Sequence, residues 1–303
     1  MNAAYMPVID SAACAAAFRA ACEMDVLAFK PGNVSLESAG HGMSARDFLI
    51  SAEVAAPCIA DPMLGLGERI YRAIEATRLS VGCNTNLGIV LLAAPLIHAA
   101  QQRRPDEGLA DALDRSLDGF DLEQTTWAFR AIRLAAPGGL GRSQRHDVHD
   151  TAKAPLRMAM REASRRDCIA RQYANGYADI LGSGRAALAE ARQRWGEDAP
   201  AMSTLFISYL ADYPDSHVQR KHGAAAAEGV RQMARQCQKE VRLCGDWQQA
   251  RKPLEELDRT LKSAGINPGT SADLSVATWL LDPLLDLETA SSFSPTETGA
   301  QHV

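Results

Sequence analysis

VRQMARQCQKEVRLC, residues 230–244, shows the pattern that decides the fold class of this chain. Apolar side chains recur every three or four positions and fall on one face, while arginine, lysine and glutamate fill the other. That spacing has the period of an amphipathic α-helix. The apolar positions are Val230, Met233, Ala234, Cys237, Val241 and Cys244.

The same period extends over most of the chain. Alanine, the best helix former, dominates several of these stretches, and alternating strand-type runs are nearly absent. We therefore predict an all-α fold: a single compact multi-helix domain at 1–290, followed by a disordered tail at 291–303. The further expected helices lie at about 10–28, 44–60, 64–78, 86–103, 121–136, 164–195, 199–213, 246–264 and 271–286, with irregular stretches at 30–42, 79–85 and 137–154.

Composition excludes several classes of protein. The 303 residues carry a formal net charge of −5, which argues against an electrostatic nucleic-acid binder. No stretch approaches the roughly 18 uncharged apolar residues of a membrane-spanning helix, and the N-terminus lacks the basic region of a signal peptide. The seven cysteines form no Cys-x-x-Cys pair, so we expect free thiols in a reducing cytoplasm.

Five polar segments interrupt the helices. The first, KPGNVS at 30–35, places Lys30 on a tight turn whose glycine permits a close backbone approach to a ligand. The second, GCNTNLG at 82–88, puts Asn84, Thr85 and Asn86 at a helix N-terminus, where free N–H groups attract anions. An ordinary turn would explain the first segment, and a single helix cap would explain part of the second.

The third segment, HDVHD at 146–150, offers ligand types for Mg²⁺ or a transition metal, although a solvated loop would explain it equally well. The fourth, DYPDSH at 212–217 with RKHG at 220–223, has two carboxylates that lead into a helix with a cationic first turn, which would suit a polyanion such as a triphosphate. The fifth, GINPGTSADL at 265–274, shapes a tight loop in which Thr270 or Ser271 caps the last helix.

Taken in this order, the segments resemble those of the triphosphoribosyl-dephospho-CoA synthase family. The family pattern reads approximately KPG-(N/L)-V, a His-rich turn, G-x-NT-(H/N)-x-G, D-(T/S)-x-(I/V)-x-R-x-x-G and (N/S)-PG-x-SADL, and it matches about residues 14–285. The chain has Asn86-Leu87 where the best-known members have His-Lys. With these departures the chain resembles a divergent subgroup of the family, similar to members found in archaea and C1-metabolising bacteria.

The resemblance implies a transferase that uses ATP and 3′-dephospho-CoA, releases adenine and needs Mg²⁺. It implies phosphate contacts from Lys30, Arg220 and Lys221, and a nucleotide site formed by Asn84, Thr85 and Asn86, with Asn33 and Ser271 as further binding residues. For Mg²⁺ or for stabilising an oxocarbenium-like state the candidates are Asp47, Asp147 and Asp215; for proton transfer they are His41, His146 and His217.

Other interpretations remain open at this point. A related transferase could act on a precursor of a C1-carrier cofactor such as methanopterin or methylofuran. A metal-dependent hydrolase could cleave a phosphoester or N-glycosidic bond through His146, Asp147 and Asp215. A non-catalytic helical scaffold would need caps but not clustered Lys, His and Asp. Alanine-rich helices pack equally well inside one domain or between subunits, so a homo-oligomer also stays open.

Overall fold

Helix α12 (Ala224–Leu243) has the buried face that its sequence predicts. Ala227, Val230, Ala234, Cys237 and Val241 are buried against the neighbouring helices α10 and α13. Met233, expected on the same face, is 37% exposed. The buried face of α12 therefore excludes Met233 and extends one turn further toward the N-terminus, to Ala227.

The computed structural model describes residues 9–38, 40, 42–104 and 106–292, with the side chains of 288–292 left out. In this part of the chain the regular structure is helical and no β strand occurs, which confirms the predicted fold class. The elements are α1 (Ser11–Leu27), α2 (Ala45–Ile59), α3 (Leu66–Val81), α4 (Leu87–Gln102), α5 (Leu109–Asp118), α6 (Leu122–Ala135), α7 (Leu156–Ala163), α8 (Cys168–Asn175), the π-helical turn η1 (Asp179–Gly184), α9 (Arg185–Trp195), α10 (Asp198–Asp212), α11 (Ser216–His222), α12, α13 (Trp247–Ser263) and α14 (Gly269–Ser292).

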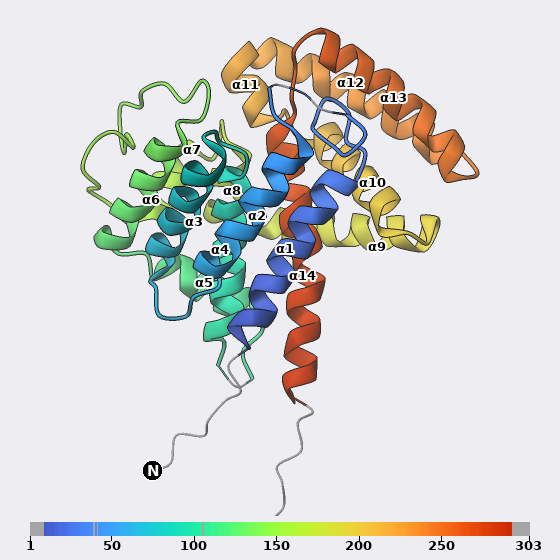
Figure 1. Cartoon of the computed structure of the whole chain (residues 1–303). Helices are drawn as coiled ribbons and strands as arrows, with labels where there is room; N and C mark the ends of the chain where they lie inside the picture. The colour runs from blue at the N-terminus through green and yellow to red at the C-terminus, as the bar shows by residue number, and fades with distance from the viewer. Residues whose placement is uncertain (1–8, 39, 41, 105, 293–303) are drawn as a thin grey trace, which may run out of the picture.

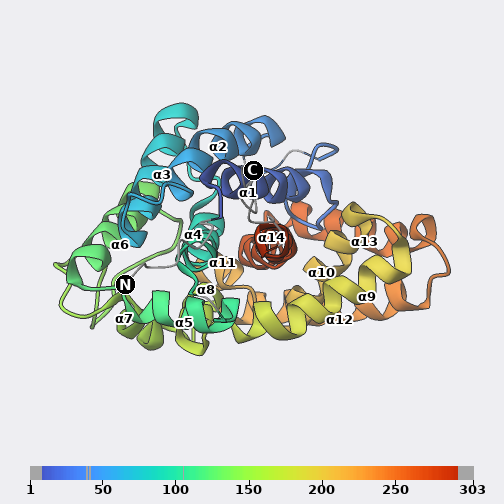
Figure 2. The same cartoon turned by 90° about the horizontal axis from the view of Figure 1, so that it is seen from below.

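Helix α14 runs through the middle of the molecule (Figure 1), where it packs against α1, α4 and α10. Seen along its axis in Figure 2, α3 to α8 lie on one side of α14, and α9, α10, α12 and α13 lie on the other. The larger hydrophobic cluster spans α1 to α9 with one face each of α10 and α14, and a smaller one joins α10 to α13. The two clusters share α10 and α14, so the helices form a single compact domain.

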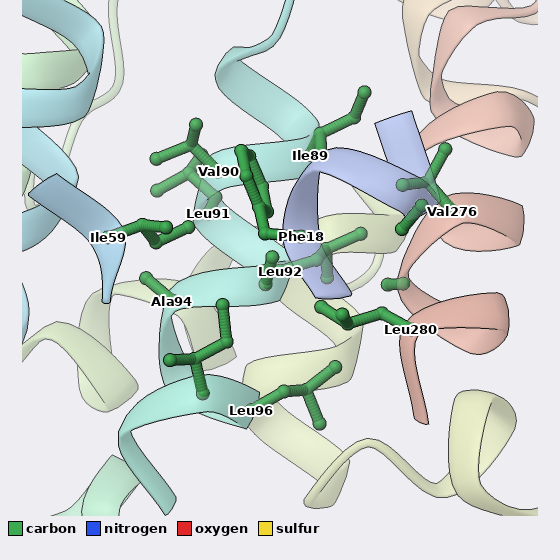
Figure 3. Close-up of a cluster of buried hydrophobic side chains, with 14 of the residues drawn as sticks. Phe18, Ile59, Ile89, Val90, Leu91, Leu92, Ala94, Leu96, Val276 and Leu280 are labelled. Carbon is green, nitrogen blue, oxygen red and sulfur yellow. The ribbon is translucent and has the colours of Figure 1, made fainter. Parts of the chain in front are cut away.

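Helix α4 is the most deeply buried element of the larger cluster. Its sequence LGIVLLAAPLIHAAQQ is apolar nearly all round, which is typical of a helix surrounded by others. Figure 3 shows Val90, Leu91, Leu92, Ala94 and Leu96 of α4 packed between Phe18 of α1, Ile59 of α2, and Val276 and Leu280 of α14. This packing fixes the N-termini of α4 and α14 relative to α1.

Three features of the chain differ from the sequence expectation. The stretch 164–195, predicted as one helix, is divided into α8, η1 and α9, because Gly176 ends α8 in the left-handed conformation and Tyr177 follows with φ of 61°. Helices α5 and α7 are not expected from the sequence, and the helix expected in the fourth polar segment is the short, separate α11. Of the expected tail, residues 291 and 292 belong to α14, and 293–303 lie outside the described residues.

All seven cysteines are free, and Cys14, Cys22 and Cys237 are buried, as expected for core residues. Among the described helices none is both long and apolar enough to cross a membrane. The expected domain limits at 1 and 290 stay a prediction.

Candidate active site

One cavity of about 500 Å³ collects all five polar segments. Residues more than 200 positions apart in the sequence therefore line the same space, because α4, α11 and α14 begin beside one another. The polar contributions, in the order of the segments, are Asn33; Asn84 and Thr85; His146 and Asp147; His217 and Arg220; and Asn267, Thr270 and Asp273.

The opposite wall of the cavity is apolar. It is built from α4, α6, α7 and α8, through Leu91, Phe129, Ile132, Met160 and Ile169. Polar groups that face such a wall interact more strongly than they would in water, because the local dielectric constant is low. The cavity thus combines a few polar groups with apolar surroundings, as ligand sites commonly do.

The first and fifth segments are bound to each other. Gly32 has φ of +77°, and a Cβ at this position would lie 2.9 Å from the carbonyl oxygen of Ile266. The Gly32 N–H donates to Asp258 Oδ1 at 2.8 Å, and Asn33 Nδ2 donates to Asn267 Oδ1 at 3.1 Å. The glycine thus serves a close approach between two loops, where the sequence suggested an approach to a ligand.

Lys30 is 1% exposed, and its side chain does not line the cavity. Its Nζ lies 3.1 Å from Asp25 Oδ1 and also donates to the backbone carbonyls of Asp25 and Ala28. Asp25 does line the cavity. The geometry gives Lys30 an ion pair with a cavity carboxylate, in place of the phosphate contact expected from the sequence.

The second segment forms the start of α4. Asn84 and Thr85 line the cavity, whereas Asn86 is the N-cap residue and donates from Nδ2 to Thr77 Oγ1 at 3.0 Å. Thr85 Oγ1 lies 2.6 Å from Ser51 Oγ, which fixes the threonine against α2. Of the three predicted nucleotide residues, two therefore line the cavity, and Asn84 also accepts from the Leu87 N–H at 3.1 Å, whereas the Asn86 side chain bonds to α3 and makes no cap hydrogen bond.

Asp273, four residues after Gly269 begins α14, lines the cavity, whereas its sequence pattern indicated only a helix start. A Cβ at Gly88 would lie 2.0 Å from Asp273 Oδ2, so the carboxyl group rests on the first turn of α4. Burial, followed by the charges of Asp25 and Asp215, raises the pKa of Asp273 well above its usual range. A carboxyl group that keeps its proton in a cavity is a candidate general acid.

Asp25 is the second carboxylate that sequence reasoning missed. It is 2% exposed and lies on the buried face of α1 beside Ala21, Cys22 and Val26. An acidic residue on an otherwise apolar helix face is rarely buried unless it is paired, and this position was the available signal. Together Asp25 and Asp273 give the cavity two carboxyl groups from different helices.

Asp215 lies behind the cavity and does not line it. It is 1% exposed; Oδ1 accepts from the N–H groups of His217 and Val218 at 2.9 and 3.0 Å, and Oδ2 accepts from Ser271 N and Oγ, both at 2.8 Å. Burial is the largest influence on the pKa of Asp215 and raises it, against these hydrogen bonds. Asp215 and Ser271 thus join the starts of α11 and α14, away from the cavity surface.

His217 follows directly and lines the cavity. A Cβ at Gly269 would lie 2.6 Å from His217 Nδ1, so the imidazole packs on the glycine of the fifth segment. The His217 backbone N–H also lies 3.2 Å from Thr270 Oγ1. Asp215 and Gly269 together determine where this imidazole lies.

The cations of the fourth segment lie in the last turn of α11, so the expected cationic first turn is wrong. Asp215 starts this short helix, and Gly223 ends it three residues after Arg220, which puts the charges where the helix dipole favours them. Arg220 lines the cavity, and its Nη1 lies 2.5 Å from Asp167 Oδ2. Lys221 is exposed and lies outside the cavity lining.

In the third segment, His146 and Asp147 both line the cavity. Asp147 is 4% exposed and accepts from the backbone N–H groups of Ser143 and His149 at 2.7 and 2.8 Å. These hydrogen bonds, the one from His149 first, lower the pKa of Asp147. Asp147 is therefore an ionised carboxylate held in place by its own loop.

Two further candidates lie elsewhere. Asp47 Oδ2 accepts from Ser44 N and Oγ, both at 2.8 Å, so this carboxylate caps α2 outside the cavity lining. His41 lies outside the described residues. Within the described part of the chain, no group of three or more His, Cys, Asp or Glu is arranged to hold a metal ion.

An all-helical chain whose loops gather carboxyl, imidazole and guanidinium groups around one cavity is built as an enzyme for small-molecule substrates. The sequence profile of the CitG family, ATP:dephospho-CoA triphosphoribosyl transferase, matches residues 11–292, and the chain belongs to that family. The predicted family and the predicted enzyme class, a transferase, are thereby confirmed.

A solved structure shares the fold. It comes from Archaeoglobus fulgidus and is provisionally named a triphosphoribosyl-dephospho-CoA synthase; its TM-score is 0.60 at 24% identity, over 81% of this chain and 100% of that chain. At this identity the likeness shows the fold alone. No curated protein matches the chain.

Proposed function

We propose that this chain transfers a triphosphoribosyl group from ATP to 3′-dephospho-CoA and releases adenine. The observation that carries the proposal is the convergence of all five polar segments on one cavity in a member of this family. If the segments served only to cap helices, nothing would require them to meet at one cavity.

The reaction forms one bond and breaks one. The 2′-hydroxyl oxygen of dephospho-CoA bonds to C1′ of the ATP ribose, and the bond from C1′ to the adenine nitrogen breaks. The hydroxyl proton passes to a base, and an acid gives a proton to adenine as it leaves. Substitution at an anomeric carbon passes through an oxocarbenium-like state, which a nearby carboxylate stabilises.

The cavity residues divide among these tasks. Asp273 is assigned as the acid, because burial and the neighbouring Asp25 raise its pKa and keep the carboxyl group protonated. Asp25, held by Lys30, supplies negative charge beside C1′. His217 is assigned as the base for the hydroxyl proton, because it lines the same cavity and its ring is fixed on Gly269.

Mg²⁺ fits this donor set only as a companion of the triphosphate. Mg²⁺ that is bound to nucleotide phosphates needs just one or two protein carboxylates, and Asp147 is an ionised, buried carboxylate on the cavity. When bound, Mg²⁺ would neutralise phosphate charge. Asp47 and Asp215, which lie outside the cavity lining, are not assigned to it.

The test incubates purified protein with ATP, Mg²⁺ and 3′-dephospho-CoA, and follows adenine by chromatography and the adduct by mass spectrometry. Equal amounts of adenine and triphosphoribosyl adduct are expected. Adenine without an adduct would indicate hydrolysis, and no adenine would exclude the proposed reaction.

Two Asp→Asn variants sharpen this test. Asp273→Asn should abolish adenine release, because the amide cannot act as the acid. Asp246→Asn is the matched control: Asp246 caps α13 far from the cavity lining, and asparagine caps helices equally well. Wild-type activity of Asp273→Asn would remove this residue from the mechanism.

Small-molecule substrates fit the family. A cytoplasmic location, the absence of nucleic-acid partners and a homo-oligomeric state remain part of the proposal. The acceptor is assigned through the family description, and the incubation above tests it directly.

A further inference from the structure

The loop between α6 and α7 has a feature that the assignments above do not use. Residues 137–143, PGGLGRS, all line the cavity, so the backbone itself forms part of the wall. Gly139 and Gly141 have φ of +74° and +65°, a conformation that strains other residues. From the sequence this stretch is expected only to be irregular.

Several backbone donors of this loop have no acceptor among the residues that the structure describes. Across the described residues, the N–H groups of Gly138, Gly139, Gly141 and Arg142 make no hydrogen bond with the chain. Successive free N–H groups in a glycine-rich loop form a concave site that binds anions. Such donors need a partner, and here they lie at a cavity.

The glycines fall into two kinds. A Cβ at Gly139 would lie 2.5 Å from the carbonyl oxygen of Arg220, so Gly139 lets the loop pack on the last turn of α11. A Cβ at Gly141 would meet no described atom within 4 Å. Packing therefore does not require glycine at 141, and the space beside it stays open for a ligand.

Four arginines surround the loop, and all of them line the cavity: Arg142, Arg145, Arg166 and Arg220. Arg142 lies 3.5 Å from Asp147 and 3.8 Å from Asp150 in loose pairs, with its side chain 70% exposed. Arg166 Nη2 donates to Ser143 Oγ at 3.3 Å. Guanidinium groups bind phosphate through paired hydrogen bonds. Arg142 and Arg166 make only these long contacts, so they could bind a phosphate group with little loss of existing interactions.

We infer that residues 137–143, with Arg142, Arg166 and Arg220, form an oligophosphate subsite. The inference rests on the proposed function, because both of its substrates carry such a chain: the triphosphate of ATP and the diphosphate of dephospho-CoA. In this assignment the loop and its three arginines bind the phosphates, and Lys30 and Lys221, expected from the sequence to do so, do not. The carboxyl groups of Asp25 and Asp273 come from other helices; the carboxylates at this end are Asp147, which accepts from the Ser143 N–H, and Asp167, which pairs with Arg220.

The test measures binding of inorganic tripolyphosphate to the full chain by calorimetry, with and without Mg²⁺. The double variant Arg142→Ala/Arg166→Ala should weaken binding by at least about tenfold, since a charge-assisted hydrogen bond contributes roughly that factor. Arg161→Ala/Arg165→Ala is the matched control. It removes the same charge from two exposed arginines that do not line the cavity, and should bind as the wild type does.

A backbone variant tests the loop itself. Gly141→Ala should also weaken tripolyphosphate binding, because alanine strains the positive φ and adds a methyl group on the open side. Far-ultraviolet circular dichroism and thermal unfolding verify that each variant is folded. Equal binding by the wild type and the Arg142→Ala/Arg166→Ala variant would overturn the inference.

Saturating the protein with ATP or with dephospho-CoA before tripolyphosphate is added distinguishes the two sources of phosphate. If ATP displaces tripolyphosphate and dephospho-CoA does not, the subsite binds the triphosphate; the reverse assigns it to the acceptor. Displacement by neither would place binding elsewhere and overturn the inference. Loss of binding in the arginine variant of a chain that releases no adenine would retain the subsite and reject the proposed reaction.

Discussion

The carboxyl group of Asp273 rests on Gly88: a Cβ at residue 88 would lie 2.0 Å from Asp273 Oδ2 and 2.3 Å from Cγ. No side chain larger than hydrogen fits between them. The contact joins the first turn of α4 to the N-terminal part of α14, so the position of the proposed acid depends on a residue that carries no functional group.

Gly88→Ala is therefore expected to reduce adenine release by at least about tenfold, because the methyl group displaces Asp273. Overpacking of this kind also costs about 1–3 kcal/mol of stability. Activity assays and urea unfolding measure the two effects. Gly229→Ala is the control: apart from the adjoining backbone of α12, no described atom would lie within 4 Å of a Cβ at this position, so stability should rise by about 0.5–1 kcal/mol with activity unchanged.

Asp273→Asn should lose activity and gain stability at neutral pH. The folded chain holds the Asp273 proton to higher pH than the unfolded chain does, because the pKa of this carboxyl is raised in the fold. In the wild type this group therefore costs stability increasingly as the pH rises from the usual carboxyl pKa toward the raised one. Asparagine carries no such cost. Urea unfolding between pH 4 and pH 8 should show a smaller decline with pH for the variant; parallel curves would contradict the raised pKa.

Activity should follow the same ionisation. An acid that must be protonated loses function as the pH rises through its raised pKa, so adenine release should fall on the alkaline side. The measurement is kcat against pH in the wild type. A profile that rises steadily with pH would contradict the role of Asp273 as the acid.

Lys30→Met should destabilise the chain by about 3–5 kcal/mol, because it leaves the buried Asp25 carboxylate without its ion-pair partner. The double variant Lys30→Met/Asp25→Asn should recover much of that loss, since no unpaired charge remains. Activity should be lost in both variants. If Lys30→Met kept wild-type stability and lost only affinity for ATP, a direct phosphate contact would be indicated instead.

Asp215→Ala and His217→Ala should separate positioning from catalysis. Removing Asp215 deletes the cap of α11 and the bonds to Ser271, so unfolding free energy should fall by about 2 kcal/mol or more, together with activity. Removing the His217 imidazole should lower kcat by about 10²-fold or more with little change in stability. Equal stability losses in the two variants would argue against this division.

The helical fold and the five polar segments could be predicted from the sequence, because helical period and interrupting polar loops are local patterns. The partners of these residues could not. Lys30 and Asp25 stand five positions apart with no pattern that requires an ion pair. Whether Arg220 begins or ends a helix depends on Asp215 and Gly223 at its two boundaries.

Contacts between distant elements explain the remaining differences. Nothing local to Asp273 indicates that it lies against Gly88 or near Asp25, since these contacts depend on how α1, α4 and α14 pack. The glycines at 138, 139 and 141 gain their meaning only when the loop lies on α11 and faces the cavity. Aspartates in helix-start motifs are most often caps, and for Asp47 and Asp215 that interpretation describes what the structure shows.

The bonds from Gly32 to Asp258 and from Asn33 to Asn267 span 226 and 234 positions of the chain. During synthesis the first loop therefore cannot form these bonds until Asp258 and Asn267 have also been made. A nascent chain released before residue 273 would hold Asp25 and Asn84 but could not close the cavity around a nucleotide. The nucleotide binding proposed above thus requires segments far apart in the sequence to have folded together, and ATP should protect the folded protein from proteases while leaving chains truncated before residue 273 exposed.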